Sequence, residues 1–337
     1  MQTPFNTLHF FFLRMRYWFI WTLLLPGSVV AQKVSDIETS DITRFWMAYD
    51  KLPEAKTNQD SVRIIQEEYL NKASAGFREF IRLRNFTAQE YVALLGAHPR
   101  FWVSTRPLTE KIVQRVPEIN QVLDSMQKIL PDFERPGVCF AIGCMRTGGT
   151  TTERLILIGS EIAAADSTTD KSEVNAWLKS VLGQTGDIVS MVAHEAVHTR
   201  QKGFPLFEIF SLAKHKRLNL LNTAIVEGSA DFITAQLLGH HINARLHTYG
   251  SANHCLLLRE FFKDYEAKPF DVSRWLYNGN NSKDRPADLG YYIGYQISEA
   301  FYNQASDKKR ALKTLLRRGK YKKVFRKSKI DASNCVD

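Results

Sequence analysis

The sequence has only four cysteines in 337 residues, and no two of them form the C-x-x-C pair typical of structural zinc sites. It has no internal repeat, no low-complexity segment and no recognisable nucleic-acid-binding motif. These absences argue against a cysteine-held zinc module and against nucleic acid as a partner. With 44% hydrophobic and 12% aromatic residues, the chain can bury a large core, either as one domain or as two lobes.

A long apolar segment is also missing. The run over residues 17–25 is too short for a comfortable membrane span. Arg14 and Arg16 precede this run and small residues around Ala31 follow it, which is the order expected of a secretory signal peptide. We therefore predict a signal peptide over residues 1–31 and an exported protein, periplasmic or secreted, with an uncleaved membrane anchor as the alternative. No cysteine directly follows the run, so we expect no lipid anchor.

An exported protein folds in an oxidising compartment, where an even number of cysteines permits disulfides. The four cysteines allow two bridges in three connectivities. We favour Cys139 with Cys144, whose short separation suits a small loop or a strand end, and Cys255 with Cys335, which would tie the C-terminal segment to the body. Four free thiols are the alternative.

The first hundred residues after the predicted signal peptide have helical patterns. We expect a helix over about residues 42–49, and apolar residues recur at helical spacing over residues 61–83. Thr87 and Glu90 have the spacing of a capping box at the start of another helix. Residues 32–135 are therefore expected to form a helical N-terminal region.

The pattern changes after residue 135. Residues 138–142 and 154–160 are short apolar runs separated by Gly148-Gly149 and three threonines, which indicates a hairpin or a small sheet. The sequence therefore predicts an α+β fold that is predominantly α-helical.

The most informative motif is H-E-x-x-H, formed by His194, Glu195 and His198. Residues 188–202 are predicted to form a mostly buried helix that Asp187 caps. Side chains four residues apart lie on the same helix face, so both imidazoles can reach one ion with Glu195 beside it. Neutral imidazoles bind Zn²⁺ well and a nearby carboxylate can transfer protons, so the two histidines are candidate zinc ligands and Glu195 is a candidate general base.

A two-histidine site needs a third protein ligand. Glu227 and Asp231 lie four residues apart in an apolar helical stretch over residues 218–238, so one helix face can carry a ligand and a carboxylate that holds an imidazole. An exposed pair on a helix surface is the alternative, which the apolar residues on both sides weaken.

Together these features resemble the gluzincin metallopeptidases, the thermolysin-like class with a His₂Glu zinc site. The metzincin pattern is not present, because no histidine follows His198 at the required spacing. The resemblance implies a zincin-like fold with a small sheet bordering the active-site helix, Zn²⁺ as the cofactor, Glu227 as the third ligand and Asp231 as the outer partner of His194. Twenty-eight residues separate His198 from Glu227, more than in thermolysin-like enzymes, so we expect an enlarged connection over residues 204–217.

A wider resemblance covers most of the chain. It is to a bacterial family of predicted zinc-dependent proteases whose members are similar to gliding-motility lipoproteins. It rests on segments in matching order, namely residues 41–46, 148–150, 157–161, the His-Glu helix, Glu227-Gly228 and residues 290–295. It implies a zincin-like catalytic region over residues 136–307.

The gluzincin resemblance also suggests a substrate-binding strand. In that class one strand of the sheet usually borders the cleft, and its free edge can bind an extended peptide through backbone hydrogen bonds. Residues 155–158, with Leu155 and Ile158, are the candidate edge, and a fully buried strand is the alternative.

The segment over residues 285–292, shared with the resembled family, offers further substrate-binding groups. Tyr292, and after it Tyr291, is the candidate that stabilises the oxyanion, with Arg285 as a substrate-binding cation. Buried tyrosines with backbone partners are common, so a structural role is the alternative for both tyrosines.

The net charge of +10 is unevenly distributed. Between Lys308 and Ile330 there are twelve Lys and Arg and no acidic residue, whereas the rest of the chain after the predicted signal peptide is close to neutral. We expect the basic segment, residues 308–337, to pack on the catalytic region through Ala311, Leu312 and two further leucines, with its basic face solvated. Peripheral contact with an anionic envelope surface is the alternative for that face.

The sequence therefore favours an exported zinc metallopeptidase that hydrolyses peptide bonds in a peptide or protein substrate through a metal-activated water. Two alternatives stay open. A non-catalytic, envelope-associated binding or scaffold protein could keep the same helices and metal. A zinc hydrolase of a non-peptide amide would differ only in the shape of its pocket.

Overall fold

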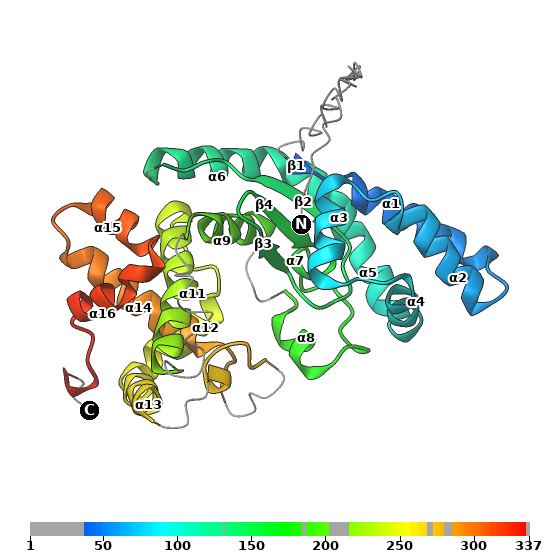
Figure 1. The fold of residues 1–337 in the computed structure, drawn as a ribbon. Coiled ribbons are helices and arrows are strands. Elements are labelled where there is room, and N and C mark those ends of the chain that lie inside the picture. The colour runs from blue at the N-terminus through cyan, green and yellow to red at the C-terminus, as the bar shows by residue number, and fades with distance from the viewer. Residues whose placement is uncertain are drawn as a thin grey trace, which may run out of the picture. The chain divides into compact units, whose positions relative to one another are not determined.

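The fold is described from a computed structural model over residues 37–130, 132–183, 187–201, 216–267, 272–279 and 285–334. Helices predominate and a small mixed sheet lies among them (Figure 1), so the predominantly helical α+β class predicted from the sequence is confirmed. The predicted signal peptide, residues 1–31, lies outside the described residues.

The N-terminal helices follow local signals in the sequence. Thr87 caps a helix by accepting a hydrogen bond from the Glu90 amide at 3.2 Å, as its position predicts. The helical stretch expected over residues 61–83 is interrupted before Ser74, which caps a new helix by accepting the Phe77 amide at 3.1 Å. The elements are α1 (Ser40–Lys51), η1 (Leu52–Glu54), α2 (Asn58–Ile65), η2 (Gln66–Leu70), α3 (Ala75–Arg84), α4 (Ala88–Ala97), α5 (Pro99–Glu110), η3 (Lys111–Arg115) and α6 (Val116–Ile129).

The sheet has the spatial order β1-β2-β4-β3. Its strands are β1 (Ile37–Glu38), β2 (Gly137–Ala141), β3 (Gly149–Thr151) and β4 (Leu155–Gly159). β1, β2 and β4 run parallel, and β3 is antiparallel to β4 with Thr150 opposite Leu157.

The expectation that residues 155–158 form a free edge is wrong, because β4 lies between β2 and β3. The edge strand on this side is β3. Ile158 is fully buried and Leu155 packs against the core. An uninterrupted apolar run is the pattern of a strand covered on both faces, so the alternative of a buried strand holds.

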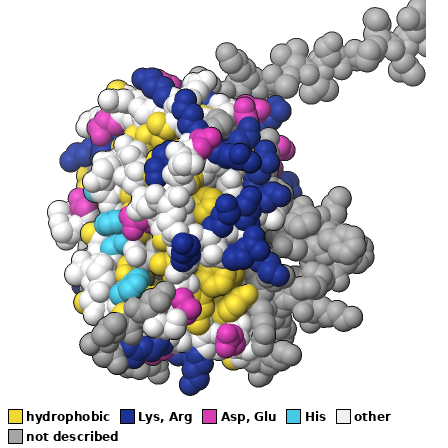
Figure 2. Space-filling model, turned by 90° about the vertical axis from the view of Figure 1, so that its left-hand side faces the viewer, with side chains coloured by type: hydrophobic (Ala, Val, Ile, Leu, Met, Phe, Trp, Pro, Cys, Tyr) yellow, Lys and Arg dark blue, Asp and Glu magenta, His cyan; other side chains and the backbone are white. Residues whose placement is uncertain are grey.

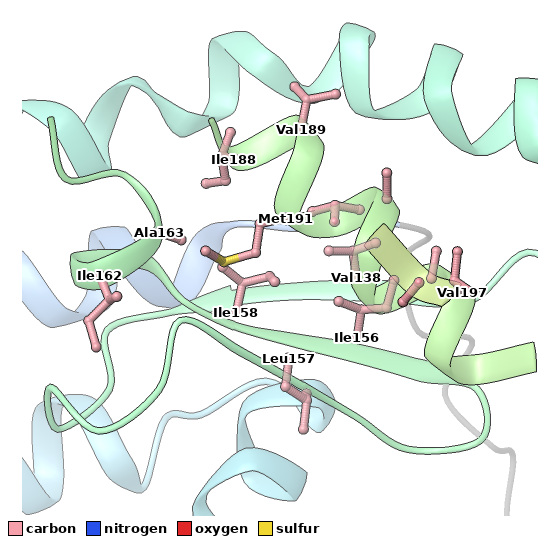
Figure 3. Packing of buried hydrophobic residues seen from close by; sticks show 14 of the residues in the cluster. Val138, Ile156, Leu157, Ile158, Ile162, Ala163, Ile188, Val189, Met191 and Val197 are labelled. Carbon is pink, nitrogen blue, oxygen red and sulfur yellow. The ribbon is translucent and has the colours of Figure 1, made fainter. Parts of the chain in front are cut away.

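Helices cover both faces of this sheet. α9 (Ile188–Arg200) packs against β3 and β4, while α1 and α3 pack against β2. Figure 3 shows Ile156 and Ile158 pointing towards α9, with Met191 among them, whereas Leu157 points to the opposite face. Since these side chains are almost completely buried, the sheet fixes the position of α9 through apolar packing.

The predicted bridge between Cys139 and Cys144 does not form, because both cysteines are buried free thiols. Cys139 lies inside β2, where its Sγ atom is 3.8 Å from Oδ2 of Asp41. Burial raises the pKa of both thiols above the ordinary value. Strand geometry holds Cys139 in the core, so sequence proximity alone does not bring the two sulfurs together. For the second predicted pair, Cys335 lies outside the described residues.

α11 (Lys216–Leu238) and α14 (Leu289–Gln304) cross at two glycines. A Cβ atom on Gly228 would lie 2.1 Å from the carbonyl carbon of Gly294, and one on Gly294 would lie 1.7 Å from the Ala224 oxygen. No side chain fits there, so the two backbones touch and fix the position of the turn of α11 that carries Glu227.

The remaining elements between β4 and α14 are α7 (Ser160–Ala163), α8 (Ala176–Val181), α12 (Ala244–Ala252), α13 (His254–Glu266) and η4 (Val272–Arg274).

The basic segment is helical where it is described. Its elements are α15 (Lys308–Leu315), η5 (Arg318–Lys320), α16 (Tyr321–Ser328) and η6 (Ala332–Asn334). Ala311, Leu312 and Leu315 are buried, α15 and α16 pack against α14, and every Lys and Arg of the segment except Arg318 is exposed. Among the described helices, none combines the length and hydropathy that a bilayer span requires.

Candidate metal centre

α9 brings the two histidines of the H-E-x-x-H motif to one point. Asp187 starts this helix by accepting a hydrogen bond from the Ser190 amide at 2.9 Å, as the sequence predicts. One turn apart on the same face, His194 and His198 place their Nε2 atoms 2.9 Å from each other. His194 is buried and His198 is largely so, which keeps the pair away from bulk water.

Glu227 reaches the same point from α11, which lies beside α9 (Figure 1). Its Oε2 atom is 3.2 Å from Nε2 of His198 and 3.5 Å from Nε2 of His194. Ligands about 2.1 Å from a tetrahedral zinc ion are separated from one another by about 3.4 Å. The three atoms therefore have the spacing of a His₂Glu site. Among the described residues, this is the group of His, Cys, Asp and Glu side chains placed to hold a metal ion.

Each imidazole is held through its other ring nitrogen. Nδ1 of His194 is 2.7 Å from Oδ1 of Asp231, the partner that the resemblance implied. Nδ1 of His198 is 2.8 Å from Oε1 of Gln201, and Nε2 of Gln201 donates to the Val226 carbonyl at 2.7 Å. Partners of this kind fix the tautomer in which Nδ1 carries the proton and Nε2 is free to bind a cation.

Charges around the centre favour a cation. Burial alone would lower the pKa of His194, but the carboxylates of Asp231 and Glu227 outweigh it and raise the pKa well above the ordinary value. Burial likewise opposes ionisation of Glu227, yet the two imidazoles hold its pKa well below the ordinary value. Positive charge between these groups is therefore stabilised, as a bound metal ion requires.

Glu195 lies beside the histidines and against the edge of the sheet. A Cβ atom on Gly149 of β3 would be only 2.7 Å from Oε1 of Glu195, so a glycine is needed where the strand passes the carboxylate. Burial raises the pKa of Glu195, and the charges of His198, His194 and Arg84 offset part of this rise. A carboxylate with a raised pKa can accept a proton near neutral pH and release it again.

An open cleft of about 1530 Å³ contains the centre. His194, Glu195, His198, Glu227 and Asp231 all line it. β3 and the turn before it form part of its wall. The volume exceeds that of typical small-ligand pockets, so a chain segment has room to enter.

The two adjacent tyrosines of α14 have different environments. Tyr291 lines the cleft, and its ring is nearly parallel to that of His194, with 6.2 Å between centroids. Tyr292 is turned away: it is buried, its OH is 2.8 Å from Nδ1 of His254, and its ring fills the space beside Gly250. Successive helix residues point in directions about 100° apart, so Tyr292 points away from the cleft when Tyr291 faces it. The structure therefore does not place Tyr292 at the oxyanion position.

Tyr277 is not among the residues predicted from the sequence, yet its OH donates a hydrogen bond to Oε1 of Glu227 at 2.8 Å. No motif marks this tyrosine, because it reaches the centre from a distant part of the chain. Gln201 was also missed, although its position three residues after His198 is a local signal that could have identified it.

Arg285 does not line the cleft, contrary to its predicted role as a substrate-binding cation. Its guanidinium donates to Oε2 of Glu260 at 2.6 Å and lies 4.5 Å from the centroid of the Trp275 ring. Leu155 and Ile158 are likewise absent from the cleft wall, because β3 separates them from it. The enlarged connection expected over residues 204–217 lies almost wholly outside the described residues.

A comparison with protein families matches part of the chain. Residues 160–316 match the model of a family described as "Predicted Zn-dependent protease (DUF2268)". No curated protein and no solved structure matches the chain. The matched range contains α9 and α11, and with them all three candidate ligands. The match and the geometry of the centre together support a zinc-dependent protease at the level of that family.

Proposed function

We propose that this chain is an exported zinc metallopeptidase of the gluzincin type that hydrolyses peptide bonds in the cleft beside α9. The observation that carries the proposal is the convergence of His194, His198 and Glu227 at the spacing of a His₂Glu zinc site, with the carboxylate of Glu195 next to it. The family match supports the same activity.

Each residue has a role that its surroundings support. When bound, zinc supplies a Lewis acid that polarises the scissile carbonyl and increases the acidity of water. Glu195 accepts the proton of the attacking water and returns it to the leaving amine, which its raised pKa favours. Asp231 and Gln201 keep both imidazoles oriented.

Tyr291 is the candidate that stabilises the oxyanion, because it lines the cleft beside His194. Burial raises the pKa of this tyrosine well above the ordinary value, so its phenol remains a hydrogen-bond donor throughout the neutral range.

The open cleft favours an enzyme over a scaffold protein. A structural zinc site encloses the ion with four protein ligands, whereas a catalytic site has three and keeps one position accessible. Here three side chains of the described residues converge, and the cleft reaches them.

The test combines metal analysis with a peptide-library digest of the purified protein, in the presence and absence of a chelator. We expect one zinc per chain, cleavage that the chelator abolishes, and recovery on adding zinc. Glu195→Gln should keep the metal and lose turnover. Cleavage that persists in chelator, or full activity of Glu195→Gln, would overturn the proposal.

Export and contact with an anionic surface belong to the same proposal. Export is supported by residues 14–31, in which two arginines precede an apolar run and small residues follow it. N-terminal sequencing of protein recovered from the periplasm or medium should begin at Gln32.

Figure 2 shows Lys and Arg side chains gathered on one side of the face that includes α15 and α16. Sedimentation with anionic but not zwitterionic vesicles would support contact through these side chains, and equal sedimentation with both would contradict it.

A further inference from the structure

The charged residues of the cleft are unevenly neutralised. Its acidic side chains are Glu195, Glu227, Asp231 and Asp288, and its basic side chains are Arg84, Arg146, Arg245 and Arg318. Glu227 and Asp231 are held by the imidazoles, and Asp288 accepts a hydrogen bond from the Asn278 amide at 3.3 Å. Glu227, Asp231 and Asp288 are thus engaged inside the protein, and the arginines differ in how far each charge is compensated.

Arg84 lines the cleft, and its backbone is held in place by its neighbours in the chain. It is the last residue of α3, which ends because Asn85 takes the left-handed conformation with φ of 50°. The chain then enters the core through Phe86, whose ring lies 5.0 Å from that of Phe80. This anchoring holds the Arg84 backbone at the wall of the cleft.

The neighbouring Arg146 is fully engaged. Its guanidinium pairs with Glu90 at 3.2 Å, lies 5.1 Å from the centroid of the Phe86 ring and donates to the Arg84 carbonyl at 2.7 Å. The charge of Arg146 is therefore neutralised by Glu90, and its guanidinium holds the backbone carbonyl of Arg84 in place.

Arg84 itself has no such partner, since no carboxylate of the described residues forms an ion pair with it. Its side chain is partly buried, and burial together with the charge of Arg146 lowers its pKa, whereas Glu195 raises it. Arg245 differs because it is exposed, so water satisfies its charge. A guanidinium partly removed from water is poorly solvated, and a bidentate carboxylate is the partner that fits it best.

We propose that Arg84 forms a carboxylate-binding subsite, so that the enzyme prefers substrates with a carboxylate close to the scissile bond. This inference rests on the proposed peptidase function and specifies its substrate class. Arg146, whose guanidinium holds the Arg84 carbonyl, lies three residues before Gly149, where β3 passes Glu195, and all four residues line the same cleft. The recognised carboxylate therefore belongs to a residue near the cleaved bond. Two sources offer this group: an Asp or Glu side chain, or the free C-terminus of the substrate.

The test uses the zinc-loaded full chain and matched peptides. One pair differs only by Glu or Gln at each position flanking the cleaved bond, and the other only by a free or amidated C-terminus. We expect kcat/KM to be on the order of 10- to 100-fold higher for the carboxylate member of one pair. The pair that shows the difference identifies the source.

Variants then assign the preference to Arg84. Arg84→Met should bring the ratio close to one, and Arg84→Glu should shift the preference towards a Lys-containing peptide. Arg82→Met is the matched control, because Arg82 is exposed on the same helix, pairs with Glu79 at 2.7 Å and does not line the cleft. Its ratio should equal that of the wild type, and thermal unfolding shows whether each variant is folded.

The outcomes separate the two proposals. Zinc-dependent cleavage with equal kcat/KM for both members of both pairs would overturn the subsite and leave the peptidase intact. A preference that survives unchanged in folded Arg84→Met would also overturn it. Absence of zinc-dependent cleavage of any peptide would overturn the peptidase function, and the subsite with it.

Discussion

The imidazole of His198 is oriented by Gln201, the C-cap residue of α9, with 2.8 Å between Nδ1 and Oε1. The same amide donates to the Val226 carbonyl at 2.7 Å and to the Ser229 hydroxyl at 3.0 Å, both on α11. One side chain therefore orients a candidate metal ligand on α9 and connects it to α11, the helix that carries Glu227.

Replacing Gln201 should weaken metal binding. In Gln201→Ala, His198 loses its Nδ1 partner and the two helices lose their connecting amide, so we expect zinc affinity to fall about 10- to 100-fold. Competition with a chromophoric chelator measures this without any substrate. Gln236→Ala, an exposed position on α11, is the control and should retain wild-type affinity. Equal affinities for both variants would show that Gln201 has no part in holding His198.

Gly149 should be required for turnover. A methyl group in Gly149→Ala would lie 2.7 Å from Oε1 and 2.9 Å from Cγ of Glu195, so the carboxylate must move. We expect kcat to fall about 10- to 100-fold with zinc content unchanged, because the substitution displaces Glu195, the proposed general base, and not the proposed zinc ligands. Gly96→Ala in α4 is the control, since the added methyl group would meet no other part of the described chain within 4 Å beyond its own helix backbone. Unchanged kcat in Gly149→Ala would contradict the placement of Glu195.

The parts of the site that follow helix periodicity could be predicted from the sequence. His194 and His198 share a face of α9, and Glu227 and Asp231 share a face of α11, because a spacing of four residues is a local property of a helix. Apolar surroundings marked both helices as buried, and burial brings their polar faces together. The small sheet could also be predicted from a local signal, namely two short apolar runs separated by glycines and threonines.

The predictions that were wrong concern residues whose surroundings depend on distant parts of the chain, which the local sequence does not specify. The run at residues 155–158 identified a strand, but its place between β2 and β3 depends on residues before and after it in the chain. Helix periodicity shows that Tyr291 and Tyr292 diverge, yet only the position of α14 against α11 decides which one faces the cleft. Arg285 could not be distinguished from a substrate-binding cation until Glu260 was placed beside it.

Tyr291 and Tyr292 should give opposite results when each loses its hydroxyl group. We expect Tyr291→Phe to lower kcat by on the order of 100-fold with little change in zinc affinity, because the proposed donor to the oxyanion is lost. Tyr292→Phe removes hydrogen bonds to His254 and Ser251, outside the cleft, so it should cost about 1 kcal/mol of unfolding free energy and leave kcat near the wild-type value. Steady-state kinetics and urea unfolding measure the two effects. The reverse pattern would return the oxyanion role to Tyr292.

The stability of the turn before β3 should depend on pH through the buried carboxylate of Glu161. This carboxylate is fully buried in α7 and accepts hydrogen bonds from the Gly143 amide at 2.8 Å and the Met145 amide at 2.9 Å. Burial raises its pKa to about 7 from an ordinary 4.5, although the amides oppose the rise. The folded protein therefore holds this proton more tightly than the unfolded chain does.

Stability should consequently decrease with pH in a way that depends on Glu161. Its contribution is complete below pH 4.5 and is lost as the pH rises through about 7. The difference in unfolding free energy between the wild type and Glu161→Gln should therefore shift against the wild type by about 2.5 kcal/mol between pH 5 and pH 8, because glutamine does not titrate. Urea unfolding in chelator measures it. Glu173 is the control. Burial alone would raise the pKa of Glu173, but Arg100 and two backbone amides hold it below the ordinary 4.5. Glu173→Gln should therefore show no such shift between pH 5 and pH 8. A constant difference for Glu161→Gln would mean that its carboxylate is already ionised at pH 5 in the folded protein.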